Sequence, residues 1–599
     1  DALLDDGGGA EKPDPAAAAA QAMAAAKARC EQRHADYASI VERRTPSVLR
    51  FRAVEAFVED VRDLGLAYQR HLLLLLLLVC GATATATRGH IALRPAQSRV
   101  DHVAAEGAQL LTHLLLAHSV WSHRAIDEAS GVANPHPELF TIWIVGALLM
   151  AALNVYHLVR PPADATPGGN PAQALFAVPL YCTMGIVAGL YFLISEGHPA
   201  GLSIYLTKLT EFARLYLQVG LYVWIGMLLK RTMLAELSVD LVRPWRLPPE
   251  LLAFVMVVGA AIPTAYSGAS GIFVIAVGAV IYDELRQAGA RRQLALAATA
   301  MSGSLGVVLS PCLLVVIVAS LNKQVTTDHL YGWGLKVFLL TAVLFLVASL
   351  LNRQNKLQLA SPGEAVKGTL AAVRPLVPYA LVAAAVLAFY AFGLDATVDE
   401  NYAPVVLPVL LLAMLVYDRR LARKRAAPGE AVVGFNASVQ RATTETSHHI
   451  GALLFLMGLS ICLGGVIERA DLMAYFPQQF ASVWTTMGLL VVVLVIVGMI
   501  MDPYGAVILV SATIAEVAYR NGIDPVHFWM VVLVAFELGY LTPPVALNHL
   551  LTRQVVGEEE ARLAFAEQGS FWHRHERILL PVSVMATALV IVAFGPLLF

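Results

Sequence analysis

The chain has 599 residues, of which 58% are hydrophobic and only 14% are charged, and its formal net charge is −2 at pH 7. Soluble domains contain about 45–50% apolar and about 25% charged residues, so the composition excludes a soluble globular protein. The small net charge argues against nucleic acid as a partner. We therefore expect an all-α polytopic protein embedded in a lipid bilayer.

Residues 1–64 are predicted to be a disordered or amphipathic N-terminal region. Asp1–Arg29 is rich in Ala, Gly and Asp and lacks a core-forming pattern, which is typical of a disordered tail. Cys30–Arg70 alternates charged and apolar residues, so it forms either amphipathic helices at a membrane surface or a solvated cytoplasmic helix. The sequence starts without Met and is expected to be a fragment.

Apolar runs follow, most of them long enough to cross a hydrocarbon core of about 30 Å. In residues 65–165, His71–Thr87 and Leu139–Val159 are predicted spans, whereas Ala104–Trp121 is more amphipathic than spanning. The predicted spans of residues 166–430 are Ala172–Ile194, Glu211–Leu229, the interrupted runs Leu251–Ile281 and Leu294–Ser320, then Val337–Leu351, Leu376–Phe392 and Val405–Val416. Those of residues 431–599 are Ile450–Ile467, Met487–Met501, an interrupted pair within Gly498–Thr552, and Leu579–Phe599.

These runs amount to roughly 13–15 membrane-inserted elements. The densest basic loop, Arg419–Arg425, is predicted to be cytoplasmic.

Basic segments also lie on both sides of Leu251–Ile281, at Lys230–Arg246 and Arg286–Arg292. A simple crossing would put them on opposite faces of the membrane, so a hairpin that enters and returns is favoured.

The segment Gly498–Thr552 is broken twice, at Asp502-Pro503 and at Thr542–Pro544. Proline removes a backbone donor and frees an upstream carbonyl group, and lipid offers no water to replace the lost partner. The breaks therefore predict paired half-helices whose free ends meet inside the protein, where carbonyl oxygens can hold a cation.

An internal repeat relates this segment to the first half of the chain. Three matches keep the same order and nearly constant spacing: Gly226–Arg231 with Gly464–Arg469, the polar break Ser267–Gly271 with Asp502-Pro503, and Ser310-Pro311 with Pro543-Pro544. Paired interrupted segments in the two halves of a membrane chain indicate a transport site between the repeats.

Three runs of the second half carry a resemblance to a known family: Gly498–Pro503 (GMIMDP), Gly522–Phe528 (GIDPVHF) and Leu541–Asn548 (LTPPVALN). At these intervals they resemble the large membrane subunit of TRAP (tripartite ATP-independent periplasmic) transporters. The first half is similar more loosely, through Tyr266–Gly271 and Gly303–Pro311. The likeness extends over Phe212–Gly557.

The resemblance implies an ion-transporter-superfamily elevator fold with two repeats, each with a re-entrant hairpin and a broken helix. It also implies sodium-driven import of an organic acid across the bacterial cytoplasmic (inner) membrane, delivered by a periplasmic substrate-binding protein. A small membrane subunit accompanies the large one in this family, either separate or fused ahead of it, and residues 65–165 occupy that place. Sodium is the expected coupling ion, and no organic cofactor is expected.

Sodium is a hard cation that prefers oxygen ligands, which broken helices supply as free carbonyl groups. The candidate sodium ligands are Ser267, Gly268, Ser270, Gly303, Gly306 and Ser310 in the first repeat and Asp502, Thr542 and Pro543 (through its carbonyl) in the second. The family motif adds Asn548 as a polar residue that lines the site. The alternative is that the small residues only permit close helix packing, but their repeated placement favours a site.

Two intramembrane acidic residues are costly in lipid and are therefore candidates for function. Asp502 is a sodium ligand, the N-cap of the half-helix that begins at Pro503, or both. Glu537 stands where the family commonly has Asn. It is a proton carrier or a cation ligand, or else a structural residue that is neutral or paired with His549 or Arg553.

The nearest alternative function is a sodium- or proton-coupled carboxylate symporter of the same superfamily that works without a binding protein. An intramembrane enzyme is disfavoured, because Asp502 and Glu537 lie in no familiar catalytic motif. The sequence has no Gly-x-x-x-x-Gly-Lys-Ser/Thr loop, so ATP-driven pumping would need another subunit.

The cysteines and histidines do not predict a disulfide or a metal site. The five scattered cysteines lack disulfide or metal spacing, and His113, His118 and His123 do not share a helical face.

Overall fold

The computed structural model describes residues 15–42, 44–268, 270–353, 360–393, 403–425, 433–471 and 479–598. Within these ranges the chain is helical, and strand pairing is limited to two isolated bridges, Ala92 with Pro179 and Ser98 with Thr166. The prediction of an all-α protein is therefore confirmed.

The chain divides into two units, of which the first, Asp1–Gln69, contains α1 (Pro15–Glu42) and α2 (Pro46–Ala67). Almost all described side chains of these helices are exposed. The prediction of a disordered tail is wrong from Pro15 onward, because the alanine-rich run there has the highest intrinsic helix propensity. The tail residues before Pro15 lie outside the described residues.

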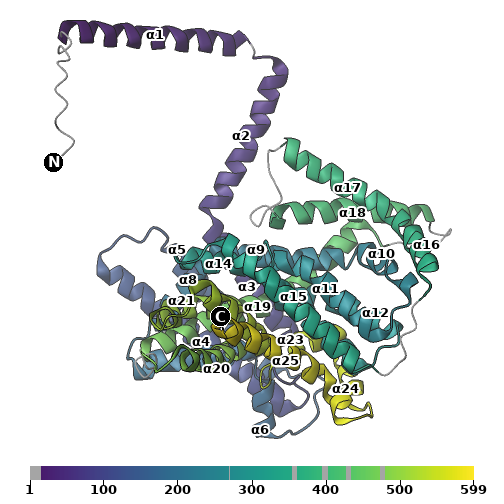
Figure 1. Ribbon diagram of the computed structural model, residues 1–599. Helices are drawn as coiled ribbons and strands as arrows, with labels where there is room; N and C mark the ends of the chain where they lie inside the picture. The colour runs from purple at the N-terminus through teal and green to yellow at the C-terminus, as the bar shows by residue number, and fades with distance from the viewer. Residues whose placement is uncertain are drawn as a thin grey trace. The chain divides into compact units, whose positions relative to one another are not determined.

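The second unit, Arg70–Phe599, contains the remaining helices (Figure 1). Those of the first part are α3 (Gln69–Thr87), α4 (Arg99–Ser130), α5 (Glu138–Val159), α6 (Pro171–Ala174), α7 (Leu180–Leu190), α8 (Gly201–Glu211), α9 (Ala213–Leu229) and α10 (Leu234–Asp240). The first repeat and its connection contain α11 (Pro249–Ser267), α12 (Ser270–Gln287), α13 (Arg292–Met301), α14 (Leu313–Leu321), α15 (Thr327–Leu351), α16 (Pro362–Val373), α17 (Val377–Ala388) and α18 (Ala403–Arg425). The last part contains α19 (Phe435–Arg469), α20 (Val483–Ile500), α21 (Pro503–Arg520), α22 (Pro525–Leu541), α23 (Leu547–Val556), α24 (Glu558–Phe565) and α25 (Phe571–Phe594).

Seven of the described helices are long and apolar enough to cross a membrane, or up to nine if each of two bent pairs forms one span. The seven are Gln69–Thr87, Glu138–Val159, Thr327–Leu351, Pro362–Gly393, Phe435–Arg469, Val483–Ile500 and Phe571–Leu598. The polytopic membrane class is confirmed. The number is smaller than the roughly 13–15 inserted elements expected from apolar runs. Some halves of the interrupted helices are too short to count as spans, and others, such as α12 and α21, contain acidic and basic residues that lower their hydropathy.

The prediction of one span over Ala172–Ile194 is wrong in its first part. A short helix, α6, and a single 3-10 turn precede Val178, whose backbone is extended (φ −67°, ψ 131°), and α7 begins only at Leu180. Pro179 explains the break, because its ring disfavours a helical conformation at the preceding residue and it has no N–H group to donate.

Two hairpins are closed by polar contacts at their open ends. Arg243 precedes α11 and its Nη2 lies 2.9 Å from Oε2 of Glu284 near the end of α12, so these two helices enter and return together. In the second repeat, the backbone N–H of Phe480, before α20, donates to Oδ1 of Asn521, after α21, at 3.0 Å. The predicted hairpin over Leu251–Ile281 is confirmed, and a second hairpin matches it.

The turn between α12 and α13 is attached to the helices that follow the second repeat. Arg291 Nη2 lies 2.9 Å from Oε1 of Glu576 on α25, and Arg292 Nε lies 3.0 Å from Oε2 of Glu560 on α24. The Tyr282 hydroxyl donates to the same Glu560 oxygen at 2.6 Å, and this bond together with Arg292 holds the pKa of Glu560 below its usual range. These contacts fasten the two repeats to each other.

A buried polar network fills the space between α4, α5 and α7 in the region predicted as a small-subunit equivalent. Asn154 Nδ2 donates to Oε2 of Glu106 at 2.8 Å, and Asn154 Oδ1 lies 2.8 Å from Nδ1 of His113. Gln109 Oε1 accepts from Asn154 and from the hydroxyl of Tyr181 on α7, each at 3.3 Å. The network links α4 and α5 to α7, which follows them in the chain.

Candidate functional site

Both interrupted helices of the first repeat meet at their breaks. The hairpin helix α11 ends at Ser267, Gly268 adopts φ +69°, and α12 starts at Ser270. A left-handed residue at this C-cap favours glycine, which has no Cβ. The second interruption separates α13 from α14, and there a Cβ on Gly303 would lie 2.2 Å from the carbonyl oxygen of Ser270. The backbones of the two breaks are therefore in direct contact.

The second repeat has the same layout. Helix α20 gives way to α21 at Asp502-Pro503, and α22 gives way to α23 between Thr542 and Ala546, which adopts φ +48°. Asp502 is the N-cap of α21, since its Oδ1 accepts from the backbone N–H groups of Tyr504 at 3.0 Å and Gly505 at 3.3 Å. The capping role expected for Asp502 is confirmed, and its role as a sodium ligand stays a prediction.

A cavity of about 20 Å³ lies where the two repeats meet. Its lining residues are Ser270, Gly271 and Ile272 of α12, Leu453 and Met457 of α19, Asp502, Pro503 and Tyr504 at the start of α21, Tyr540 of α22, and Leu547, Asn548 and Leu551 of α23. A water molecule needs about 10–15 Å³ of such volume, so the space fits one water or one small cation. Three residues predicted from the sequence, Ser270, Asp502 and Asn548, come together here.

Asn548 connects the repeats through their polar side chains. Its Nδ2 donates to the hydroxyl oxygens of Ser270 at 3.2 Å and of Ser304 at 3.3 Å. The same two hydroxyl groups interact with the carboxyl group of Glu537 on α22. All four side chains are buried. The structure thus places Glu537 beside the interruptions of the first repeat, although it belongs to the second.

Asp502 has a second partner on α19. The Ser460 hydroxyl of α19 donates to its Oδ2, and a Cβ on Gly505 would lie 2.5 Å from the Ser460 oxygen. Helix α19 therefore closes one side of the cavity against Asp502.

Several buried polar atoms around the cavity have no hydrogen-bond partner within the described residues. They are the hydroxyl oxygens of Tyr216 and Tyr540 and the Oε2 atom of Glu537. Buried polar groups in native proteins are nearly always paired, so such atoms indicate a place for water or an ion. Of these three residues only Tyr540 lines the cavity, where its hydroxyl oxygen joins the polar side chains of Ser270, Asp502 and Asn548 among mostly apolar residues. Oxygen atoms of this kind are the ligands that a hard cation prefers.

Other predicted residues are not in the cavity lining. Ser310 and Pro543 are exposed, and the Thr542 hydroxyl donates to the carbonyl of Leu538 at 2.6 Å. Gly306 packs against α11, because a Cβ there would lie 2.4 Å from the carbonyl oxygen of Ala261. Gly306 therefore takes part in the close helix packing that the alternative describes. The roles of Gly306, Ser310, Thr542 and Pro543 as sodium ligands stay predictions.

The remaining candidates in the first repeat are placed by their backbones. Gly268 packs on the start of α14, since a Cβ there would lie 2.9 Å from the backbone nitrogen of Leu313. Ser267 ends α11, and its side chain is outside the described residues. The structural alternative that paired Glu537 with Arg553 is wrong, because Arg553 instead lies 3.2 Å from Glu558 and donates to backbone carbonyls before α4.

The sequence interpretation missed Ser304, Ser460 and the two tyrosines Tyr216 and Tyr540. Ser304 carried a signal, because it lies between two candidate glycines in the interruption of Leu294–Ser320. Ser460 and Tyr216 lie inside apolar helices far from either break in the sequence. Only their packing against Asp502 and Tyr504 reveals them.

Comparison with known proteins gives a family match that covers most of the chain. The family described as "Tripartite ATP-independent periplasmic transporter, DctM component" matches residues 172–598. The matched segment contains both hairpins, both broken helices and every residue of the cavity lining. It begins after α3, α4 and α5.

Two curated relatives are both called C4-dicarboxylate TRAP transporter large permease protein DctM. The one from Vibrio cholerae is 24% identical over 314 residues, which is 51% of this chain and 69% of the relative. The one from Pseudomonas aeruginosa is 25% identical over 315 residues, with the same coverage of 51% and 69%. The crystal structure of the Alcanivorax borkumensis YdaH transporter aligns with 69% of this chain and 90% of its own at 14% identity, and the TM-score of 0.40 carries no conclusion.

Proposed function

Because the chain belongs to the DctM-component family of tripartite ATP-independent periplasmic transporters, we propose that it is a sodium-coupled secondary carrier that imports an organic carboxylate delivered by a periplasmic binding protein. It is a multi-pass transporter of the bacterial cytoplasmic membrane. The observation that carries the proposal is the small cavity at which Ser270, Asp502 and Asn548 of the two repeats meet.

The charges around the cavity support coupling to a cation. Asp502 is 2% exposed, and within the described residues it forms no ion pair with a basic side chain. An ionised carboxylate buried without a counter-charge is far more costly than a lost hydrogen bond. A carboxylate substrate would add further negative charge. Cation binding therefore precedes or accompanies the anion, which is the physical basis of symport.

The size of the cavity supports a carrier that must rearrange. Its volume of about 20 Å³ holds a cation and no organic acid. The substrate therefore binds when the hairpin breaks separate from α19, whose Ser460 holds Asp502 in the closed arrangement. The ion pairs of Arg291 and Arg292 with the helices after the second repeat keep the repeats together during this movement, as an elevator-type transport domain requires.

The curated relatives named above support a carboxylate as the substrate class. For the partners, we propose that α3, α4 and α5 supply the fused equivalent of the small membrane subunit. They precede the segment that matches the family and are tied to α7 by the network around Asn154. A soluble periplasmic binding protein completes the transporter.

Uptake by the purified chain in proteoliposomes tests this proposal. We expect accumulation of a labelled C4-dicarboxylate to require an inward sodium gradient and the addition of its binding protein, and to be lost when potassium replaces sodium. Full uptake by the membrane chain alone contradicts the tripartite mechanism. Undiminished uptake without sodium contradicts the coupling.

One observation favours a second candidate, a proton-coupled symporter that needs no binding protein. Glu537 is buried among hydroxyl groups, and its Oε2 has no hydrogen-bond partner within the described part of the chain. A protonated carboxyl group would be stable in such surroundings.

The Glu537→Gln variant separates the two candidates. The amide preserves the shape and the hydrogen bonds of a protonated carboxyl group. If the carrier is sodium-coupled, we therefore expect the Glu537→Gln variant to keep sodium-driven uptake and to show no response to a pH gradient. Glu516→Gln is the control, because Glu516 is exposed on α21 and pairs with Arg520 of the same helix at 2.9 Å. If a pH gradient drives uptake in the unmodified protein and in Glu516→Gln but not in Glu537→Gln, the proton carrier is favoured.

A further inference from the structure

We propose that His71, His136 and Glu138 form a binding site for a divalent transition metal ion of the zinc class. His71 lies at the start of α3, Glu138 is the first residue of α5, and His136 lies in the loop just before it. None of the three lines the cavity between the repeats. The proposal is independent of sodium coupling and of the transported substrate.

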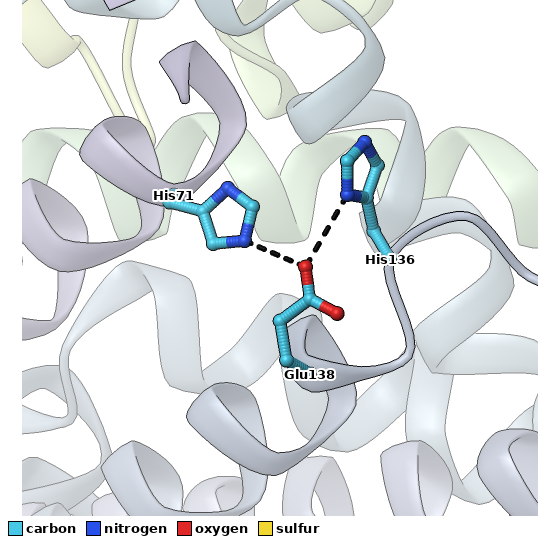
Figure 2. Close-up of side chains that lie close together, drawn as sticks. All are labelled: His71, His136 and Glu138. Atoms are coloured by element: carbon cyan, nitrogen blue, oxygen red, sulfur yellow. Dashed lines mark hydrogen bonds and ion pairs between the residues drawn. The ribbon is translucent and has the colours of Figure 1, made fainter. Parts of the chain in front are cut away.

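The ligand atoms converge on one point, as Figure 2 shows. Nε2 of His71 lies 2.8 Å and Nδ1 of His136 lies 3.3 Å from Oε1 of Glu138. All three atoms lie within 4.8 Å of one another. Ligands of a four-coordinate zinc ion lie about 2.0–2.2 Å from the metal, so small side-chain rotations bring these atoms into the first coordination sphere.

The donor types select the metal class. Two imidazole nitrogens and one carboxylate oxygen suit zinc and its neighbours, whereas sodium, magnesium and calcium prefer oxygen ligands alone. Exposed fractions of 19%, 34% and 49% for the side chains of His71, His136 and Glu138 let an ion enter from water and keep a solvent ligand. A three-ligand site with an open position is the common form of accessible zinc sites.

The loop that carries His136 is held in place before any metal binds. Its neighbours Pro135 and Pro137 restrict the backbone on both sides. The side chain of Asn134 accepts from the backbone N–H of His136 at 2.9 Å and donates to Asp127 of α4 at 3.0 Å. A ligand on a preorganised loop loses little conformational entropy on binding.

A metal ion here would join α3 to the α4–α5 connection. His71 and Glu138 are 67 positions apart in the chain and come from different helices. The ion would therefore stabilise the helices that precede the family-matched region. The alternative explanation is that Glu138 only accepts hydrogen bonds from the two imidazole rings. The following experiment distinguishes a metal site from such a hydrogen-bonded cluster.

The test uses the full chain in detergent, purified without a polyhistidine tag and stripped with a chelator. We expect isothermal titration with Zn²⁺ to give one site per chain, and Co²⁺ to give the visible absorption bands of a four- or five-coordinate ion with nitrogen ligands. His71→Ala, His136→Ala and Glu138→Gln should each weaken binding at least about tenfold. The matched control is His118→Ala, since His118 is exposed on α4 and outside the cluster.

Zinc should also raise the unfolding temperature of the unmodified chain and of His118→Ala, and not of the other three variants. Equal zinc binding in all four variants, or no binding by the unmodified chain at micromolar zinc, overturns the proposal. If a ligand variant fails to fold, Glu138→Gln decides, because it keeps the hydrogen-bonding capacity of the side chain and removes its charge.

Discussion

The Asp502→Asn variant is expected to fold as the unmodified protein does and to need about 2–30 times more sodium for half-maximal uptake. Asparagine is as good an N-cap as aspartate, so α21 keeps its first turn. What disappears is the negative charge beside the cavity, and bonds to charged groups contribute about 1.5–3 kcal/mol where neutral ones contribute about 1 kcal/mol. Sodium-dependent uptake in proteoliposomes measures the change.

A matched control exists in the same repeat. Asp524 caps α22 by accepting from the backbone N–H of His527 at 2.9 Å, precedes a proline as Asp502 does, and is exposed. Asp524→Asn should leave the sodium dependence unchanged. An Asp502→Asn variant with the sodium affinity of the unmodified protein would falsify the ligand role and leave Asp502 as a cap alone.

Replacement of Gly303 with alanine is expected to abolish uptake and to lower the unfolding temperature. The added Cβ would lie 2.2 Å from the carbonyl oxygen of Ser270 and 2.7 Å from its Cα. These are backbone atoms that cannot rotate away, so the two breaks of the first repeat must separate. Overpacking of this kind costs about 1–3 kcal/mol, and it displaces Ser270 from Asn548.

Gly259→Ala is the control for this prediction. Gly259 lies in α11, and a Cβ there would meet no atom within 4 Å. Alanine at that position should be neutral or slightly stabilising, since it has the higher helix propensity. Thermal unfolding in detergent and uptake are measured on both variants. Normal uptake by Gly303→Ala would show that the contact between the two breaks is not needed for transport.

Much of the site's framework could be predicted because its signals are local. Pro503, Pro543 and Pro311 lie at three of the four breaks, and the Ser/Gly run Ser267–Gly271 makes the fourth. Proline alone is not a sufficient signal, because Pro263, Pro408 and Pro581 lie inside helices. Asp502 before Pro503 has the sequence pattern of an N-cap, and the structure confirms that role. The repeat added a second signal, because the same order of breaks occurs twice.

Predictions failed where local signals compete. Alanine and charged residues in Asp1–Arg29 were compatible with disorder and with helix, and the described part is helical. The apolar run Ala172–Ile194 was long enough to span the membrane, yet Pro179 divides it. Ser310, Thr542 and Pro543 lie outside the cavity lining, and their role as sodium ligands stays a prediction.

The amino-acid sequence by itself determined the membrane class, the positions of the chain breaks, the twofold repeat and the family, because each depends on residues that are close along the chain. Only the tertiary structure decided which broken ends meet, that Glu537 lies against Ser270 and Ser304, and that His71 lies against Glu138. These contacts join residues from different helices. Their partners are selected by packing over the whole unit, and no local pattern of residues specifies that packing.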